Sequence, residues 1–230
     1  GLSLSQVEEK VTEAYESFVF HRVFSLLYNF CTVEMSSIYM DVLKDRMYCD
    51  AKEGPSRRSG QTVMYRILDA LVRMLAPILA HTAEEAWAAM QYKSQNVDSV
   101  HLALMPVPDE TLKVTVSEAE WDKIMMLRDE VLKVLEDLRK EQIIGSNQEA
   151  LVNIQTDDDQ LLELIRSTGP EFAKLCIISE YNIEKGDTLK IAAQKCPYAK
   201  CERCWNYYPS VGQNPDQPDL CGRCAKIVTG

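Results

Sequence analysis

The chain has 230 residues, of which 46% are hydrophobic and 26% are charged, a composition typical of a globular protein with one large or several small domains. No apolar run approaches the length that spans a bilayer, so a membrane-spanning helix is excluded. The formal net charge of −10 disfavours a nucleic-acid partner, because phosphate binding needs clustered Lys and Arg.

The first 53 residues predict two or three consecutive helices. Ser5-Gln-Val-Glu8 matches a capping box, in which the Ser hydroxyl and the Glu carboxylate satisfy exposed amides, so a helix should begin near Gln6. Apolar and aromatic residues then recur at helical spacing, and Gly and Pro are absent from Leu2 to Glu53. This stretch is too long for a single helix.

Two further helices complete an all-helical bundle in the first hundred residues. Gly54-Pro55-Ser56 ends the first run, and the next helix should begin at Ser59 or Thr62. Pro77 kinks or closes that helix, and a second capping box, Thr82-Ala-Glu-Glu85, opens a short one.

After the bundle the pattern changes from helical to mixed. His101 to Val116, with two prolines, is typical of an extended linker, and apolar residues at i, i+3, i+4 and i+7 predict a helix from Glu118 to Gln142. A small α/β unit should follow. It consists of strands at 151–155, 175–179 and 188–192 and a short helix at 157–167.

The last thirty residues contain two Cys-x-x-Cys pairs, Cys201 with Cys204 and Cys221 with Cys224, sixteen residues apart. This is ligand spacing for one tetrahedral zinc ion, because each turn aims two thiolates at one point. Four thiolates close the coordination shell, so the zinc ion should have a structural and not a catalytic role. The other four cysteines are scattered along the sequence without a spacing that suggests disulfide pairs, which favours the reducing cytoplasm. Cys196 is interpreted as a thiol that does not bind the metal.

Several segments carry a resemblance to class I aminoacyl-tRNA synthetases. Those in the first hundred residues are similar to the anticodon-binding helical bundle of the isoleucine, valine and leucine enzymes; they are Phe20-His-Arg-Val23 with Leu27-Tyr-Asn-Phe30, Tyr39-Met-Asp-Val-Leu-Lys-Asp-Arg46, Arg57-Arg-Ser-Gly-Gln-Thr62, and Leu75-Ala-Pro-Ile-Leu79 with Thr82-Ala-Glu-Glu-Ala-Trp87. Later segments narrow the match to the isoleucine branch; they are Trp121 with Leu127-Arg-Asp-Glu-Val131, Leu135-Glu-Asp-Leu-Arg139, Lys200-Cys-Glu-Arg-Cys-Trp205 and Cys221-Gly-Arg-Cys224. Over essentially all of its length, the chain resembles the C-terminal half of bacterial-type isoleucyl-tRNA synthetases.

The resemblance implies a mainly α fold in four parts. These are an anticodon-binding helical bundle (1–100), a linker and connecting helix (101–145), a small α/β unit (146–195) and a zinc-binding knuckle (196–230). The family attaches isoleucine to tRNA(Ile) with ATP in translation. The sequence lacks its His-x-Gly-His and Lys-Met-Ser-Lys-Ser type signatures and its editing domain. We therefore expect a C-terminal fragment that is itself inactive, with ATP bound only in the absent catalytic domain.

The resemblance also implies the partners, which are tRNA(Ile) and the catalytic and editing domains of the parent chain, with no DNA and no membrane; we expect a monomer. Proteins read anticodon bases by stacking and by hydrogen bonds to base edges. The candidate tRNA contacts are Trp205, Arg203, Arg223 and Lys200 in the knuckle and Lys44, Arg46, Arg57 and Arg58 in the bundle. The bundle cations could equally form helix-to-helix salt bridges or face the catalytic domain, and Trp205 could instead be the core of the knuckle.

Three other interpretations stay open at this stage. The thiol spacing also resembles the zinc finger of formamidopyrimidine-type DNA glycosylases, although that repair family needs an N-terminal Pro-Glu pair and this chain begins Gly1-Leu2-Ser3. A zinc-ribbon protein-protein adaptor would tolerate the net charge of −10 better than an RNA binder. A class I synthetase for another amino acid would share the bundle but not the four-cysteine terminus.

Overall fold

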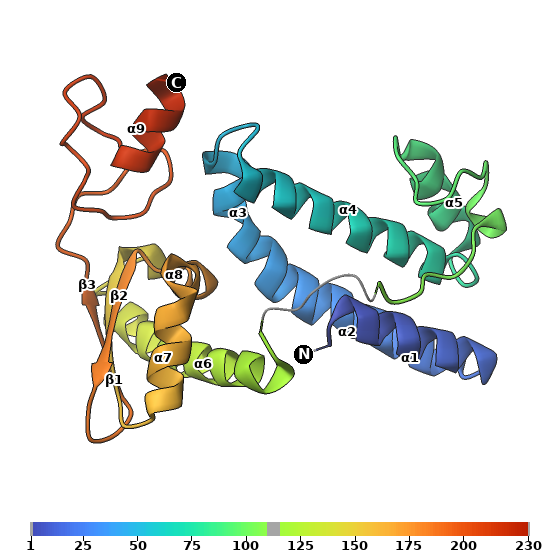
Figure 1. The fold of residues 1–230 in the computed structure, drawn as a ribbon, viewed down its shortest axis with the longest axis horizontal. Coiled ribbons are helices and arrows are strands. Elements are labelled where there is room, and N and C mark those ends of the chain that lie inside the picture. The colour runs from blue at the N-terminus through green and yellow to red at the C-terminus, as the bar shows by residue number, and fades with distance from the viewer. Residues whose placement is uncertain (1, 110–115, 230) are drawn as a thin grey trace. The chain divides into compact units, whose positions relative to one another are not determined.

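The computed structural model describes residues 2–109 and 116–229, which divide into two compact units. The helical unit contains residues 2–47 and 52–109, and the mixed unit contains residues 48–51 and 116–229. Figure 1 shows the elements of both units along the chain. No helix in the described part of the chain is long and apolar enough to cross a membrane. The division into four parts predicted from the sequence stays a prediction.

Helices form almost all of the helical unit. Its elements are α1 (Leu4–Glu16), α2 (Phe20–Asn29), a π-helical segment η1 (Phe30–Tyr39), α3 (Met40–Cys49, whose last two residues belong to the mixed unit), α4 (Pro55–Leu75), α5 (Ala80–Ala89) and a 3-10 turn η2 (Val100–Leu102). One core joins α1, α2 and α4 through Val7, Val11, Leu27 and Met74. A second core surrounds the fully buried Trp87 of α5. The predicted all-helical character of this region is confirmed.

The predicted start of the first helix was wrong. The helix begins at Leu4, and the capping box joins Ser3 to Gln6: Ser3 Oγ accepts from the Gln6 N–H (3.3 Å), and Gln6 Oε1 accepts from the Ser3 N–H (2.9 Å). The predicted capping box had paired Ser5 with Glu8, but Glu8 is a buried residue of the helix, as is Val7 before it. A Gln at the third helical position caps as well as a Glu, so the earlier of two overlapping boxes forms.

Two other predicted helix starts were also wrong. Helix α4 begins at Pro55 with Gly54 as its N-cap, because the fixed φ of proline suits the first helical position. Helix α5 begins at Ala80, so the expected Thr82 capping box does not form. Glu84, the residue before the acid of that expected box, accepts from the Val100 N–H and from Ser99 Oγ, each at 2.9 Å, and thereby holds the η2 turn.

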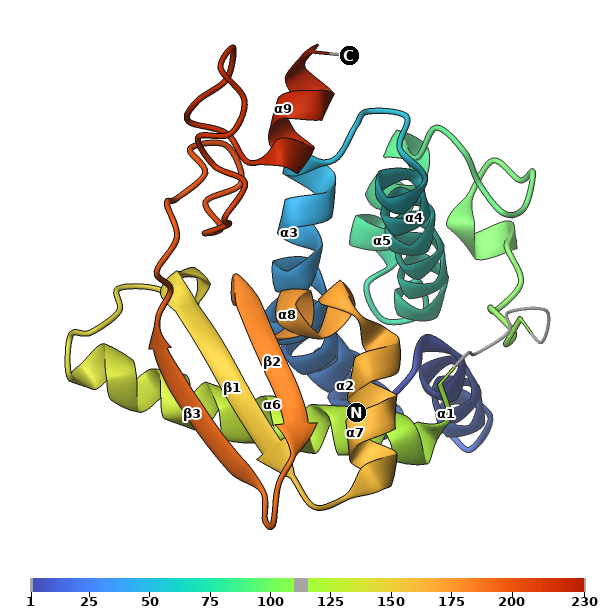
Figure 2. The same ribbon diagram turned by 60° about the vertical axis from the view of Figure 1, so that its left-hand side comes forward.

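The mixed unit combines a long helix with a three-stranded sheet. Its elements are α6 (Glu118–Lys140), a 3-10 turn η3 (Asn147–Glu149), β1 (Ala150–Thr156), α7 (Asp159–Thr168), α8 (Pro170–Cys176), β2 (Glu180–Lys185), β3 (Lys190–Lys195) and α9 (Gly222–Thr229). The strand order is β2-β1-β3, with β1 parallel to β2 and antiparallel to β3. Figure 2 shows the sheet with α6 passing behind it and α7 beside β2. Val131 and Leu135 of α6 pack with Val152 and Ile154 of β1 in one core.

The strand predicted at 175–179 was wrong. Pro170 begins α8, whose Phe172 and Cys176 are buried one helical turn apart, and Ile177 then turns the chain with a φ of +57°. The strand β2 starts only at Glu180. The predicted helices at 118–142 and 157–167 and the strands at 151–155 and 188–192 are confirmed with small shifts of their ends.

Glu8 gives the helical unit a pH-dependent stability. Burial raises the pKa of its carboxyl from 4.5 to about 7; Asp109 and Asp69 add to the shift and Arg73 opposes it. The folded state thus binds this proton more tightly than the unfolded chain, so the free energy of unfolding falls as the pH rises from 4.5 to about 7, by about 2 to 3 kcal/mol. The variant Glu8→Gln should remove this loss.

We expect Glu8→Gln to unfold at a higher denaturant concentration than the native sequence at pH 8, and at a similar one near pH 4.5. The measurement is fluorescence of Trp87 in a background without Trp121 and Trp205. The control is Glu9→Gln, because Glu9 is exposed on the same helix. Equal midpoints for the two variants at pH 8 would contradict the assignment.

Candidate metal centre and nucleic-acid interface

The zinc knuckle, residues 196–229 as the structure describes them, contains two turns that each present a thiol pair. In the first turn the Trp205 N–H donates to Cys201 O (2.8 Å), and the Cys201 N–H donates to Asn206 O (2.9 Å). The second pair lies at the start of α9. The Cys221 N–H donates to the sulfur of Cys201 (3.3 Å), which links the two turns.

The four thiols converge as the sequence spacing predicts. The sulfur atoms of Cys201, Cys204, Cys221 and Cys224 all lie within 4.8 Å of one another, and all four residues are buried. Cys204 Sγ and Cys221 Sγ are 3.9 Å apart. In a tetrahedron with Zn–S bonds of about 2.3 Å, the sulfur atoms are separated by about 3.8 Å. The donor set and its spacing therefore fit one zinc ion, and in the described part of the chain no other such group gathers.

The electrostatics of the thiol cluster also favour a cation. Burial raises the pKa of the Cys204 and Cys224 thiols, and the neighbouring thiolates add to both shifts. The pKa of Cys201 is lowered despite its burial, because backbone N–H groups of Cys204, Cys221 and Arg203 donate to its sulfur. The cluster cannot hold four thiolates at neutral pH without a compensating positive charge, which a divalent metal would supply.

Two arginines predicted as tRNA contacts have protein partners beside the cluster. The guanidinium of Arg203 donates to Cys224 Sγ (3.6 Å) and to the carbonyl oxygen of Cys49. Arg223 pairs with Asp50 at 3.3 Å. Cys49 and Asp50 belong to the 48–51 segment of the mixed unit, and Cys49 is buried against the four thiols. Both arginines therefore help to hold the knuckle together.

Trp205 does not form the core of the knuckle. Its side chain is 59% exposed, and its φ of +65° lies in the left-handed region. Lys200 Nζ lies 5.5 Å from the centroid of the indole ring. The core consists of the thiols with Tyr208, Val211 and Leu220 packed against them. The structure thus brings Trp205 and Lys200 together at the surface.

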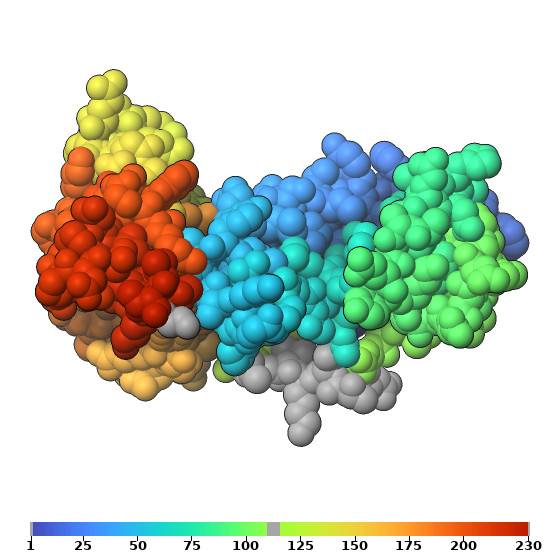
Figure 3. Space-filling model, turned by 90° about the horizontal axis from the view of Figure 1, so that it is seen from above, coloured from blue at the N-terminus to red at the C-terminus, as the bar shows by residue number. Residues whose placement is uncertain are grey.

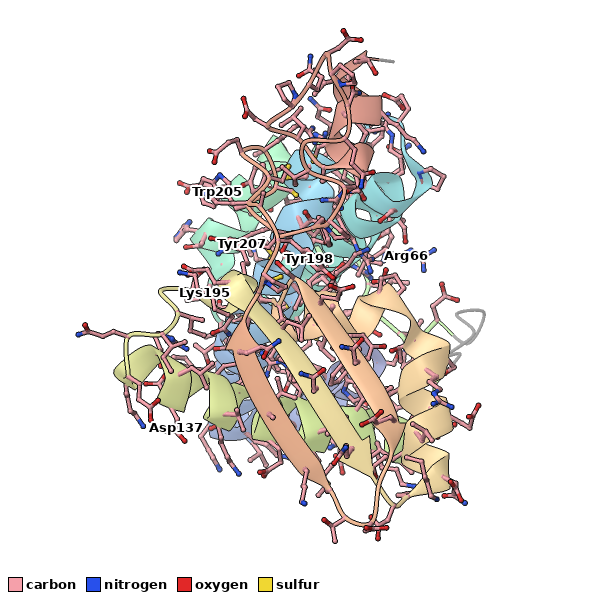
Figure 4. All side chains as sticks on the ribbon, turned by 90° about the vertical axis from the view of Figure 1, so that its left-hand side faces the viewer. Arg66, Asp137, Lys195, Tyr198, Trp205 and Tyr207 are labelled. Atoms are coloured by element: carbon pink, nitrogen blue, oxygen red, sulfur yellow. The ribbon has the colours of Figure 1, made fainter. Side chains whose placement is uncertain are left out.

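The knuckle forms an outer surface of the mixed unit, coloured orange to red in Figure 3. In Figure 4, Lys195, Tyr198, Tyr207 and Trp205 follow one another from the end of β3 into the knuckle. Aromatic and cationic side chains therefore gather on one side of this unit, as a base-stacking platform requires.

Two of the four predicted contacts in the helical unit form ion pairs. Lys44 pairs with Asp41 at 2.5 Å, and Arg58 pairs with Glu53 through its Nε at 3.0 Å. The Nε atoms of Arg46 and Arg57 are buried. These two pairs lie within α3 and between α4 and the segment that precedes it, so neither joins two helices, and the role of these residues in tRNA contact stays a prediction.

Two buried polar residues that the sequence analysis did not single out shape the knuckle. Asn206 Nδ2 donates to Cys204 O (3.4 Å). Ser179 Oγ donates to Gln148 O (2.5 Å) and accepts from the Tyr207 N–H (2.6 Å). No local motif marks Ser179, because both of its partners are about thirty residues away in the sequence.

Comparison with known proteins identifies the class. Residues 3–154 match the family described as anticodon-binding domain of tRNA ligase, and residues 200–227 match the zinc finger found in FPG and IleRS. Since the first match covers well over half of the chain, the chain belongs to the tRNA ligase family that carries this anticodon-binding domain. The zinc finger by itself does not distinguish the two classes, because its family is found in FPG as well as in IleRS. The anticodon-binding domain excludes the DNA glycosylase interpretation.

Three similar relatives are each named isoleucine–tRNA ligase. The chain is 39% identical over 228 residues to that of Caldicellulosiruptor saccharolyticus, 40% over 234 residues to that of Brachyspira hyodysenteriae, and 38% over 236 residues to that of Syntrophotalea carbinolica. Each match covers 98% of this chain and 25% of the relative. The resemblance to the isoleucine branch is confirmed, and the chain spans about a quarter, not a half, of these relatives' length.

The thiol cluster gives a direct prediction for zinc content. We expect the native sequence to bind one zinc ion per chain and Cys201→Ser to bind zinc at least 100-fold more weakly, because one of four thiolates is lost. Cys196→Ser is the matched control, since Cys196 is a buried thiol of the same knuckle outside the cluster. Zinc affinity is measured by competition with a chromophoric chelator. A loss of zinc in Cys196→Ser, or full binding by Cys201→Ser, would contradict the ligand set.

Proposed function

We propose that this chain is the part of an isoleucine–tRNA ligase that binds tRNA(Ile), with the helical unit reading the anticodon and the zinc knuckle making a second contact. The observation that carries the proposal is the occurrence of an anticodon-binding domain and this zinc finger in one chain that aligns over 98% of its length with isoleucine–tRNA ligases. The ATP-dependent attachment of isoleucine would take place in another part of the ligase, in the cytoplasm.

The metal is proposed to be one structural zinc ion held by Cys201, Cys204, Cys221 and Cys224. Four thiolates leave no open coordination position, so the ion would activate neither water nor substrate. It would supply the positive charge that the buried thiols need. The proposed organisation keeps a bundle (1–100), a connecting region (101–145), an α/β unit (146–195) and the knuckle (196–230), in a monomer.

Within the knuckle, Trp205 and Lys200 are the contacts that the geometry favours. A left-handed conformation costs a non-glycine residue about 1 to 2 kcal/mol, and such strain is retained where it serves a site. Here the conformation accompanies an indole ring that faces solvent beside an ammonium group. Arg203 and Arg223 are assigned a supporting role, because both bind protein groups.

The cations of the helical unit are proposed as weaker, electrostatic contacts. Lys44 and Arg58 pair with exposed carboxylates, and such surface pairs are worth about 1 kcal/mol or less, so phosphates could replace them at low cost. Arg46 and Arg57 lie in the same part of the sequence, on either side of the loop between α3 and α4. Their contribution should fall steeply as the salt concentration rises.

Binding of the zinc-loaded chain to tRNA(Ile), and to the same tRNA with its anticodon exchanged, tests the function. We expect tighter binding to the native anticodon at both of two salt concentrations, since base contacts survive salt and phosphate contacts do not. Equal binding that salt abolishes would mean that anticodon recognition resides outside this chain. Absence of binding to either tRNA would favour a protein-protein adaptor.

Replacement of Trp205 tests the stacking contact. Trp205→Ala should weaken tRNA(Ile) binding by about 1 to 3 kcal/mol, whereas Trp205→Phe should retain most of the affinity, because a phenyl ring still stacks on a base. Zinc content should stay at one ion per chain in both variants. Trp121→Ala is the control, as Trp121 is an exposed tryptophan of α6, outside both the knuckle and the helical unit. Unchanged affinity in Trp205→Ala would remove Trp205 from the interface.

A further inference from the structure

Ser179 joins three segments of the mixed unit through one buried hydroxyl group. The residue lies between α8 and β2 and is only 4% exposed. Its Oγ donates to the carbonyl of Gln148, beside the turn that precedes β1, at 2.5 Å. The same oxygen accepts from the Tyr207 N–H in the knuckle at 2.6 Å. A hydroxyl can donate and accept at once, so one atom connects the sheet to the knuckle.

We propose that Ser179 is a positioning residue for tRNA recognition: it sets the direction in which the aromatic turn, residues 205–208, presents Trp205. The inference rests on the proposed function, because it takes Trp205 as the RNA contact. The proposal goes beyond that function because the orientation of the Trp205 ring is assigned to Ser179, a buried residue outside the knuckle that would itself make no contact with RNA.

The peptide groups of Tyr207 are held from two sides. Its N–H is bound by Ser179, and its carbonyl oxygen lies 3.8 Å from the thiol of Cys196. The Cys196 N–H in turn donates to Glu149 O (2.7 Å), on the same turn whose Gln148 carbonyl binds Ser179. Tyr207 is thus tied to the body of the unit at a point two residues from Trp205, and rotation of the aromatic turn would break these links.

The thiol cluster stabilises the knuckle internally, whereas Ser179 connects the knuckle to the sheet. Its turns are closed by bonds within the knuckle, such as Trp205 N–H to Cys201 O and Cys221 N–H to Cys201 Sγ. These bonds determine the internal fold of the knuckle and not its direction. Lys200 is paired with Tyr207 in a short antiparallel bridge, so the cation that lies near the indole ring moves with the turn that Ser179 holds.

Removal of the buried Ser179 hydroxyl leaves the Tyr207 N–H and the Gln148 carbonyl, both of half-buried residues, without this partner. In the zinc-loaded chain, we expect Ser179→Ala to keep one zinc ion and to bind tRNA(Ile) about tenfold more weakly. Amide exchange at Tyr207 should be at least tenfold faster. Ser179→Thr, which retains the hydroxyl, should restore the exchange rate and the affinity. Ser167→Ala is the control, since Ser167 is an exposed hydroxyl of α7 that bonds only within its own helix.

A double variant separates positioning from a general effect on stability. Trp205→Ala combined with Ser179→Ala should bind tRNA no more weakly than Trp205→Ala alone, because without the ring there is nothing left to orient. Additive losses, loss of zinc in Ser179→Ala, or native affinity despite faster exchange at Tyr207 would each overturn the proposal. If the native chain binds no tRNA, the proposed function is contradicted, whatever the role of Ser179. If amide exchange at Tyr207 is unchanged in Ser179→Ala, the positioning role of Ser179 is overturned, whatever the affinity for tRNA.

Discussion

The knuckle depends on the convergence of four buried sulfur atoms within 4.8 Å. The knuckle has one regular helix, α9, and few apolar side chains, so a hydrophobic core of ordinary size is not available to it. Burial and mutual repulsion oppose ionisation of the thiols, and a divalent cation reverses that balance. The metal–thiolate bonds would stabilise the knuckle in place of a hydrophobic core. Trp205, the single tryptophan of the knuckle, can therefore lie at the surface, with Lys200 over its ring.

This arrangement would account for the proposed recognition of RNA by an acidic chain. The net charge of −10 disfavours broad contact with phosphates, and the arginines nearest to the thiols are occupied by Cys49, Cys224 and Asp50. The knuckle presents at its surface an exposed indole ring with the Lys200 ammonium group beside it, which suits a splayed base better than a duplex backbone. The zinc site would then stabilise the turn, Ser179 would orient it, and Trp205 would make the contact.

Local patterns in the sequence predicted the parts of this account that depend on neighbouring residues. The metal ligands follow from two Cys-x-x-Cys turns, and the helices follow from apolar periodicity. Helix starts were predicted less well, because Ser3 and Ser5 both offer a capping box and only packing of Val7 and Glu8 decides between them. The misplaced strand at 175–179 has the same origin, since a short apolar run fits either a strand or the end of a helix. The role of Ser179 was beyond prediction, as its hydroxyl acts only once η3 and the knuckle have folded around it.

The central claim is that the zinc-held fold of the knuckle is what presents Trp205 to tRNA. The most direct test measures tRNA(Ile) affinity for the zinc-loaded and the metal-free chain, each with the native sequence and with Trp205→Ala. The account predicts that removal of zinc weakens binding by the native chain about as much as loss of the ring does, and weakens binding by the variant little further. An equal loss on zinc removal with and without the ring would contradict it, because zinc would then act on tRNA binding by a route independent of Trp205.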